Sequence, residues 1–142
     1  MIKNKKFIKF IKKYCYFVIP IPTIFILTIL YSFQILRFPD SEDFLSTLVG
    51  TAGALIGFLF TAMTIFFSLN KNTEYMKNFK KYGHDIIFGR LITFGIIFLC
   101  INIIFWLFNL NQHITIISFV LGLEETVMAA YYTYKLSLNS FK

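Results

Sequence analysis

Long runs of mostly apolar residues alternate with short polar segments along the chain. Four of these runs cover residues 14–36, 44–70, 87–110 and 114–134. A helix needs about 20 predominantly apolar residues to cross the hydrocarbon core of a bilayer, and every run reaches that length. The pattern therefore predicts an all-α, polytopic membrane protein whose four transmembrane helices form a single domain.

The polar segments at the ends and between the second and third runs carry most of the positive charge. Residues 1–13 interleave six lysines with Phe and Ile at helical spacing, which is typical of a basic amphipathic helix in the headgroup layer. Residues 71–86 form a basic cytoplasmic loop, part of which we expect to be an interfacial helix that ends at Gly83. Residues 135–142 form a short polar tail.

The distribution of Lys and Arg predicts how the helices are oriented. Six lie before the first run, five lie at positions 71–90 and two lie in the tail, whereas the two remaining turns hold only Arg37. Because cytoplasmic loops are enriched in Lys and Arg, this count predicts an N-in/C-in topology. Nine of the basic residues are expected to contact lipid headgroups or a partner: Lys5, Lys6, Lys9, Lys12, Lys13, Lys77, Lys80, Lys81 and Arg90.

The composition agrees with a membrane protein. Hydrophobic residues make up 57% of the chain and charged residues 15%, whereas soluble domains carry about 25% charged residues. The net charge of +7 could indicate nucleic-acid binding, but the basic residues lie beside the apolar runs. We therefore assign them to anionic lipids and expect no nucleic-acid partner.

Small residues recur along one side of the second run. Six of them span 18 positions in five steps, a mean of 3.6, so they lie on one face of a helix: Gly50, Gly53, Gly57, Thr61, Thr64 and Ser68. In lipid, helices associate through close backbone approach at such faces. This small-residue stripe is expected to pack helices, either within one molecule or between the protomers of a homo-oligomer, and both alternatives stay open.

The last run contains two adjacent carboxyl groups, Glu124 and Glu125, near its midpoint. Acidic groups inside a membrane span are costly and mark functional sites by default. Because the last two runs form a tight antiparallel hairpin, Asn102 should lie within about one helical turn of the pair, on the order of 5 Å. Thr28 and Thr61 lie at similar depth in the first two runs. The sequence thus predicts a polar layer that contains Glu124, Glu125, Asn102 and Thr61.

Three accounts of the carboxyl pair compete. In the first, both groups are protonated and hydrogen-bonded, with a purely structural role. In the second, the last helix leaves the bilayer early or admits water, so the pair meets solvent. In the third, the carboxylates line an aqueous path in an oligomer, where rings of acidic side chains select cations. The third account leads.

Other chemistry has weaker support in the sequence. His84 and His113 lie on opposite sides of the predicted membrane, and no Cys/His spacing matches a metal site. No Gly-rich phosphate loop opens a helix. Cys15 and Cys100 are expected at different depths, so they should not form a disulfide within one chain. We expect no metal, no cofactor and no enzymatic activity.

The segment 57–65, Gly-Phe-Leu-Phe-Thr-Ala-Met-Thr-Ile, is followed by the basic loop and another apolar run. In this respect the chain resembles small bacterial multi-span membrane proteins of anti-phage and abortive-infection systems, over residues 44–110. The resemblance implies a homo-oligomeric component of the bacterial cytoplasmic (inner) membrane that is controlled by a separate cytosolic sensor or effector protein.

The expected function is therefore an oligomeric pore-forming or membrane-perturbing effector in bacterial anti-phage defence. In this view Glu124 and Glu125 set ion selectivity or pH gating. One alternative is a non-conducting membrane anchor or scaffold that recruits a cytosolic partner. A second alternative is a holin-like protein or a small ion transporter.

Overall fold

A computed structural model describes residues 20–33, 41–69 and 73–140, and these residues are almost entirely helical. The described helices are α3 (Pro20–Ser32), α4 (Glu42–Ser68), α5 (Glu74–Lys81), α6 (His84–Leu107) and α7 (Gln112–Ser140). Within this described part, α4, α6 and residues Gln112–Leu138 of α7 are long and apolar enough to cross a membrane. The chain is thus all-helical, with three helices suited to membrane spans.

The predicted first span covered residues 14–36, of which the structure describes only part. There, α3 is a shorter apolar helix of 13 residues. The remainder of that span, the basic N-terminal segment 1–13 and Cys15 lie outside the described residues. A fourth span, the N-in/C-in orientation and the oligomer stay predictions.

Local signals explain where several helices begin and end. Ser41 is the N-cap of α4, and its hydroxyl accepts a hydrogen bond from the backbone N–H of Phe44 at 3.4 Å. Thr73 is the N-cap of α5, and its hydroxyl accepts a hydrogen bond from the backbone N–H of Met76. Gly83, with φ of 71°, adopts a left-handed conformation that suits glycine, and so separates α5 from α6.

Every predicted boundary of the three long helices differs from the structure by two to six residues; α4 covers 42–68 instead of 44–70, and α6 ends at 107 instead of 110. The segment 71–86, predicted as a loop with some helix, contains all of α5 and the first turn of α6, which begins at 84 instead of 87. The last helix covers 112–140 instead of 114–134, so most of the predicted tail 135–142 is helical. The boundaries were drawn where polarity rises, but a helix ends where its backbone hydrogen bonds end, and these continue past the apolar region.

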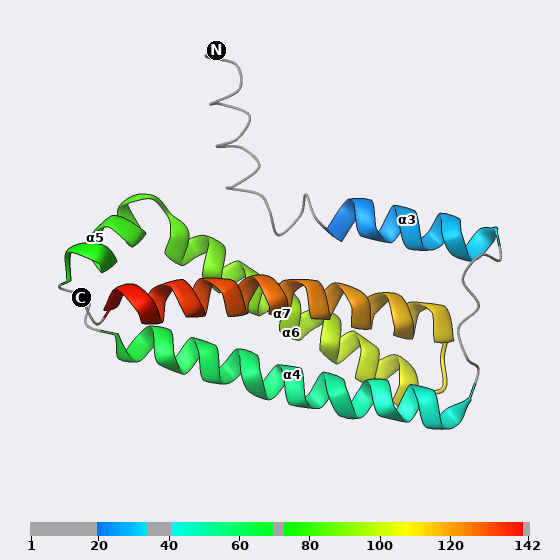
Figure 1. Cartoon of the computed structure of the whole chain (residues 1–142). Coiled ribbons are helices and arrows are strands. Elements are labelled where there is room, and N and C mark those ends of the chain that lie inside the picture. Colours follow the sequence, from blue (N-terminus) through cyan, green and yellow to red (C-terminus); the bar gives the residue numbers. More distant parts are fainter. Residues whose placement is uncertain (1–19, 34–40, 70–72, 141–142) are drawn as a thin grey trace, which may run out of the picture.

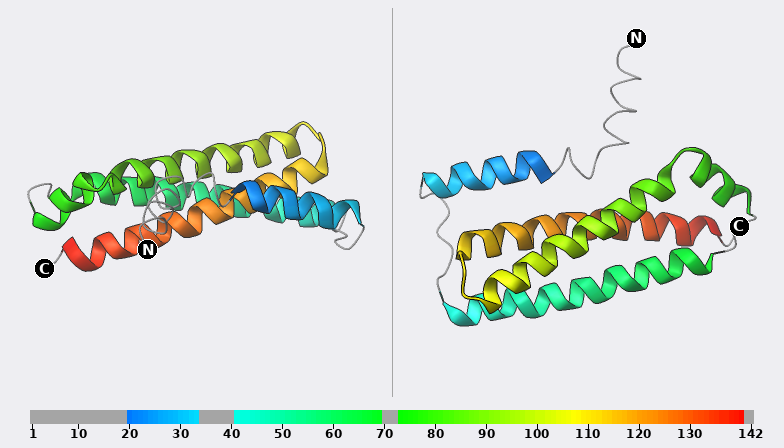
Figure 2. Two further views of the ribbon diagram at one scale, coloured as in Figure 1. Left: turned by 90° about the horizontal axis from the view of Figure 1, so that it is seen from above. Right: turned by 180° about the vertical axis from the view of Figure 1, so that it is seen from behind.

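Helices α4, α6 and α7 lie side by side as a bundle (Figure 1). The turn at residues 108–111 joins α6 and α7 into an antiparallel hairpin, and α4 packs along both helices. Helix α3 lies along the first half of α7, and α5 packs at the end of the bundle where α6 begins and α7 ends (Figure 2). The bundle core therefore runs between α4, α6 and α7.

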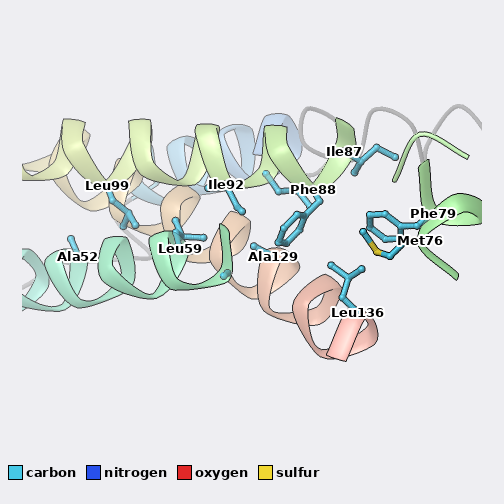
Figure 3. Packing of buried hydrophobic residues seen from close by; sticks show 12 residues of the cluster. Ala52, Leu59, Met76, Phe79, Ile87, Phe88, Ile92, Leu99, Ala129 and Leu136 are labelled. Atoms are coloured by element: carbon cyan, nitrogen blue, oxygen red, sulfur yellow. The ribbon is translucent and has the colours of Figure 1, made fainter. Parts of the chain in front are cut away.

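The close-up of the core shows apolar side chains from these helices meeting along the bundle (Figure 3). Leu59 and Ala52 of α4 face Leu99 of α6, and Ala129 of α7 lies further along the same seam. At the far end, Met76 and Phe79 anchor α5 to the bundle. The core thus joins the three long helices and fixes α5 against one end of them.

Two glycines bring the helices close together at the middle of the bundle. A Cβ atom added to Gly122 of α7 would lie 2.5 Å from Cγ of Leu99. A Cβ atom added to Gly95 of α6 would lie 2.9 Å from Cδ1 of Leu59 and 3.3 Å from Cβ of Glu125. Both positions therefore need glycine because a neighbouring side chain occupies the space.

The described charges differ between the two ends of the bundle. Lys77, Lys80 and Lys81 lie on α5, at the end where α7 finishes, whereas Glu42 and Asp43 form the first turn of α4 at the opposite end. The placement of the 71–90 segment on the cytoplasmic side stays a prediction.

Substituting Gly122→Ala should lower the thermal stability of the purified protein. The added methyl group collides with Leu99, and overpacking of this kind costs about 1–3 kcal/mol. The measurement is the unfolding temperature in detergent. The matched control is Gly89→Ala in α6, because a Cβ atom there meets nothing within 4 Å and Gly89 lies outside the small-residue stripe. Equal effects of the two substitutions would contradict the packing described for α6 and α7.

Candidate functional site

The carboxyl pair lies at the centre of α7. Glu125 is 13 residues from each end of the span Gln112–Leu138, which corresponds to about 20 Å in either direction. Adjacent residues on a helix project about 100° apart, so Glu124 and Glu125 point toward different neighbours. The pair therefore occupies the middle of the span but presents two distinct environments.

Glu125 points into the bundle. Its side chain is fully buried, with 0% exposure, and its Cβ atom lies close to Gly95 of α6. Leu59 of α4 approaches the same glycine. Neither carboxyl oxygen of Glu125 has a hydrogen-bond partner among the residues that the structure describes. The carboxyl group is thus enclosed where α4, α6 and α7 meet.

Glu124 points toward α3. Its side chain is half-buried, and Oε1 accepts a hydrogen bond of 2.7 Å from the hydroxyl of Thr23. Its other oxygen, Oε2, is buried and has no hydrogen-bond partner within the described part of the chain. A second contact holds the other end of α3 on α7: the ring centroids of Tyr31 and His113 lie 3.8 Å apart. Helix α3 therefore covers the Glu124 side of the site.

The energetic cost of this arrangement indicates what the site can do. An unpaired carboxylate in a low-dielectric interior is destabilising by several kcal/mol, because its hydration is lost without replacement. Two carboxylates side by side add their mutual repulsion. A bound proton or small cation would remove much of this cost. The pair could therefore take up a proton or a small cation.

Asn102 belongs to a separate polar contact. It is fully buried, and its Nδ2 donates a 2.8 Å hydrogen bond to the backbone carbonyl of Thr115. Thr115 lies ten residues before Glu125 on α7, which is about 15 Å along the helix. Asn102 thus ties the hairpin together nearer its turn, and the structure does not bring it to the carboxyl pair.

Thr61 lies away from the pair as well. Its side chain is exposed, and its hydroxyl donates to the carbonyl of Gly57 in the same helix. The rotation of α4 explains this, because Leu59 and Ala62 face the core and turn Thr61 outward. Thr28 is also exposed and bonds within α3. The predicted polar layer is therefore not assembled. Among the described residues, Thr23 is the hydrogen-bond partner of the pair, and comparing the depths of residues along the predicted spans did not single it out.

The small-residue stripe lies on the outer face of α4. All six of its residues are exposed, and a Cβ atom added to Gly50, Gly53 or Gly57 meets nothing within 4 Å. No described part of the molecule buries this stripe. Packing within one molecule is thus not observed for it, while packing between protomers stays a prediction.

The predicted headgroup contacts fall into two groups. The first group is exposed: α5 carries Lys77, Lys80 and Lys81, and the second turn of α6 carries Arg90. Lys5, Lys6, Lys9, Lys12 and Lys13 lie outside the described residues.

In the described ranges, no three His, Cys, Asp or Glu side chains come together as a metal site. His84 begins α6 and His113 lies in the first turn of α7, so they occupy opposite ends of the bundle.

The chain matches no known family model, no curated protein and no solved structure. Its function must therefore be argued from the geometry.

Replacing Glu125 with Leu should leave the unfolding temperature unchanged or raise it. The substitution removes a buried carboxyl group without a described partner and fills the space with an apolar side chain. Asn102→Leu is the comparison, because it removes the hydrogen bond to Thr115 and should cost about 1 kcal/mol. Thermal unfolding in detergent gives both values. A larger loss for Glu125→Leu than for Asn102→Leu would show that the carboxyl group is a structural element.

Proposed function

We propose that the chain is an integral membrane protein that lets protons or small cations cross the bilayer, with Glu124 and Glu125 as the binding site on the path. The observation that carries this proposal is the complete burial of Glu125 at the midpoint of α7, with neither oxygen hydrogen-bonded to a described residue. A carboxyl group kept at mid-membrane without a structural partner is costly, and function is the usual reason for its retention.

The position of the pair supports a transport role over a role at the surface. An ion that reaches this depth has lost most of its hydration, so it needs a compensating charge near the middle of the span. Glu125 supplies that charge about 20 Å from either end of the span. Glu124, beside it, supplies a second one toward α3.

Helix α3 is suited to act as the movable part of the path. Most of its residues are exposed, and it packs chiefly on α7. The hydrogen bond from Thr23 to Glu124 is the polar link between the two helices. Displacement of α3 would break this bond and open Glu124 to water or lipid headgroups, while the bundle of α4, α6 and α7 stays packed.

The proposal includes a homo-oligomer in the bacterial cytoplasmic membrane, with four spans and an N-in/C-in topology. The exposed small-residue stripe of α4 supports the oligomer, because such faces permit close approach of helices in lipid. A pore-forming role in phage defence under a cytosolic partner rests on the resemblance alone.

Flux measurements in liposomes test the proposal. The full chain should conduct protons or K⁺, and Glu125→Gln or Glu124→Gln should reduce the flux at least about tenfold, which is equivalent to about 1.4 kcal/mol. Glu74→Gln is the matched control, because Glu74 is exposed on α5. Release of a large entrapped dye measures non-selective leakage in the same vesicles.

The same assay separates the alternatives. A non-conducting anchor gives no flux for any variant. A holin-like protein releases the dye and is insensitive to the glutamine substitutions. Either result would refute selective passage through the carboxyl pair.

Replacing Thr23 with Val should raise the basal flux, because it removes the hydrogen bond that holds α3 over Glu124. A net protein hydrogen bond is worth about 0.5–1.5 kcal/mol, so the open population should rise by about two- to tenfold. Thr28→Val is the control on the same helix, since the Thr28 hydroxyl bonds only to the carbonyl of Ile24 in the described structure. Equal flux from the two variants would exclude α3 as a cover.

A further inference from the structure

A pocket of about 520 Å³ lies at the end of the bundle that carries α5. It is formed by α5, the first residue of α6 and the last turns of α7. Aromatic rings make up most of its wall: Tyr75, Phe79, Tyr82, Tyr131 and Tyr132. The volume lies within the range of about 300–1,000 Å³ that is usual for small-molecule sites.

The wall of the pocket is held in place by contacts between its rings. The Phe79 ring centroid lies 6.1 Å from that of Tyr75 and 6.3 Å from that of Tyr132. The amphipathic α5 inserts Phe79 and Met76 between the bundle ends and leaves its lysines outside. Figure 3 shows both side chains beside Leu136 of α7. The described wall of the pocket is thus held together by packing contacts.

The charges around the pocket favour an anion. Among the described residues that line it, Lys135 is the one with a full charge, and its Nζ lies 4.9 Å from the centroid of the Tyr131 ring. This cation–π contact holds the ammonium group beside the aromatic wall. Lys80 and Lys81 end the neighbouring α5. Glu74 and Asp85 are near in sequence but do not line the pocket.

The depth of the pocket identifies the source of the anion. Lys135 lies three residues before the end of the span Gln112–Leu138, or about 5 Å along the helix. This is the level of lipid headgroups, where Tyr side chains also gather. We propose that the pocket binds an anionic glycerophospholipid, with its phosphate on Lys135 and its glycerol and first acyl carbons against the aromatic wall.

Lipid retention by the purified full chain tests this assignment. The chain is exposed to equal amounts of phosphatidylglycerol and phosphatidylcholine in detergent, and native mass spectrometry counts the lipids that stay bound. The wild type should prefer phosphatidylglycerol. Lys135→Gln should reduce this preference at least about fivefold, because the charge-assisted contact to the phosphate is lost. Tyr131→Leu should reduce it as well, since it removes the ring that positions the ammonium group.

The matched comparison is Lys77→Gln, which removes an equal charge from an exposed, predicted headgroup-contact residue of α5 that does not line the pocket. Loss of this surface contact should weaken the preference by about twofold at most, well below the effect of Lys135→Gln. A loss as large as that of Lys135→Gln would show general attraction to a basic surface and overturn the site. Displacement of the bound lipid by millimolar inorganic phosphate would instead assign the pocket to a free phosphate. Circular dichroism of each variant confirms that the helices are intact.

Discussion

The close approach of α6 and α7 at Gly95 and Gly122 is the contact on which the rest of the structure depends. Leu99 occupies the space beside Gly122, and Leu59 of α4 occupies the space beside Gly95. Because neither glycine has a side chain, Leu99 and Leu59 fit against α7 and α6 here, and Glu125, one turn after Gly122 on the inner face of α7, is fully buried. The packing that stabilises the bundle thereby also buries the Glu125 carboxyl group, which costs free energy.

This arrangement separates the tasks of the molecule among its surfaces. The interior holds Glu125, the face of α7 toward α3 holds Glu124, and the outer face of α4 presents the small-residue stripe. The basic end holds an aromatic pocket at headgroup depth. Asn102 secures the hairpin separately through Thr115, so changes at the carboxyl pair need not loosen the turn. The proposed ion passage, assembly and lipid contact therefore involve different residues and can be tested one at a time.

The long apolar runs were sufficient to predict the three long helices of the bundle, and a short helix before Gly83 was also expected. Glu125 drew attention as an acidic residue among apolar ones, and its role stays a prediction. It could not predict which face of α4 is buried: α4 carries one stripe of small residues and another with Ala52, Leu59 and Ala62, and either suits a helix interface. Packing against α6 and α7 buries the stripe with Ala52, Leu59 and Ala62, and Thr61 therefore faces outward. Thr23 was not predicted because neither helix alone indicates which residues of α3 lie beside which residues of α7.

The central claim is that the carboxyl pair lies within the hydrocarbon region and away from water. Labelling with two carbodiimides in native membranes, read by mass spectrometry, tests it most directly. A hydrophobic carbodiimide should modify Glu124 or Glu125, whereas a water-soluble one should modify only exposed carboxyl groups such as Glu74 and Glu42. Modification of the pair by the water-soluble reagent to the same extent as Glu74 would place it in bulk solvent and contradict the account.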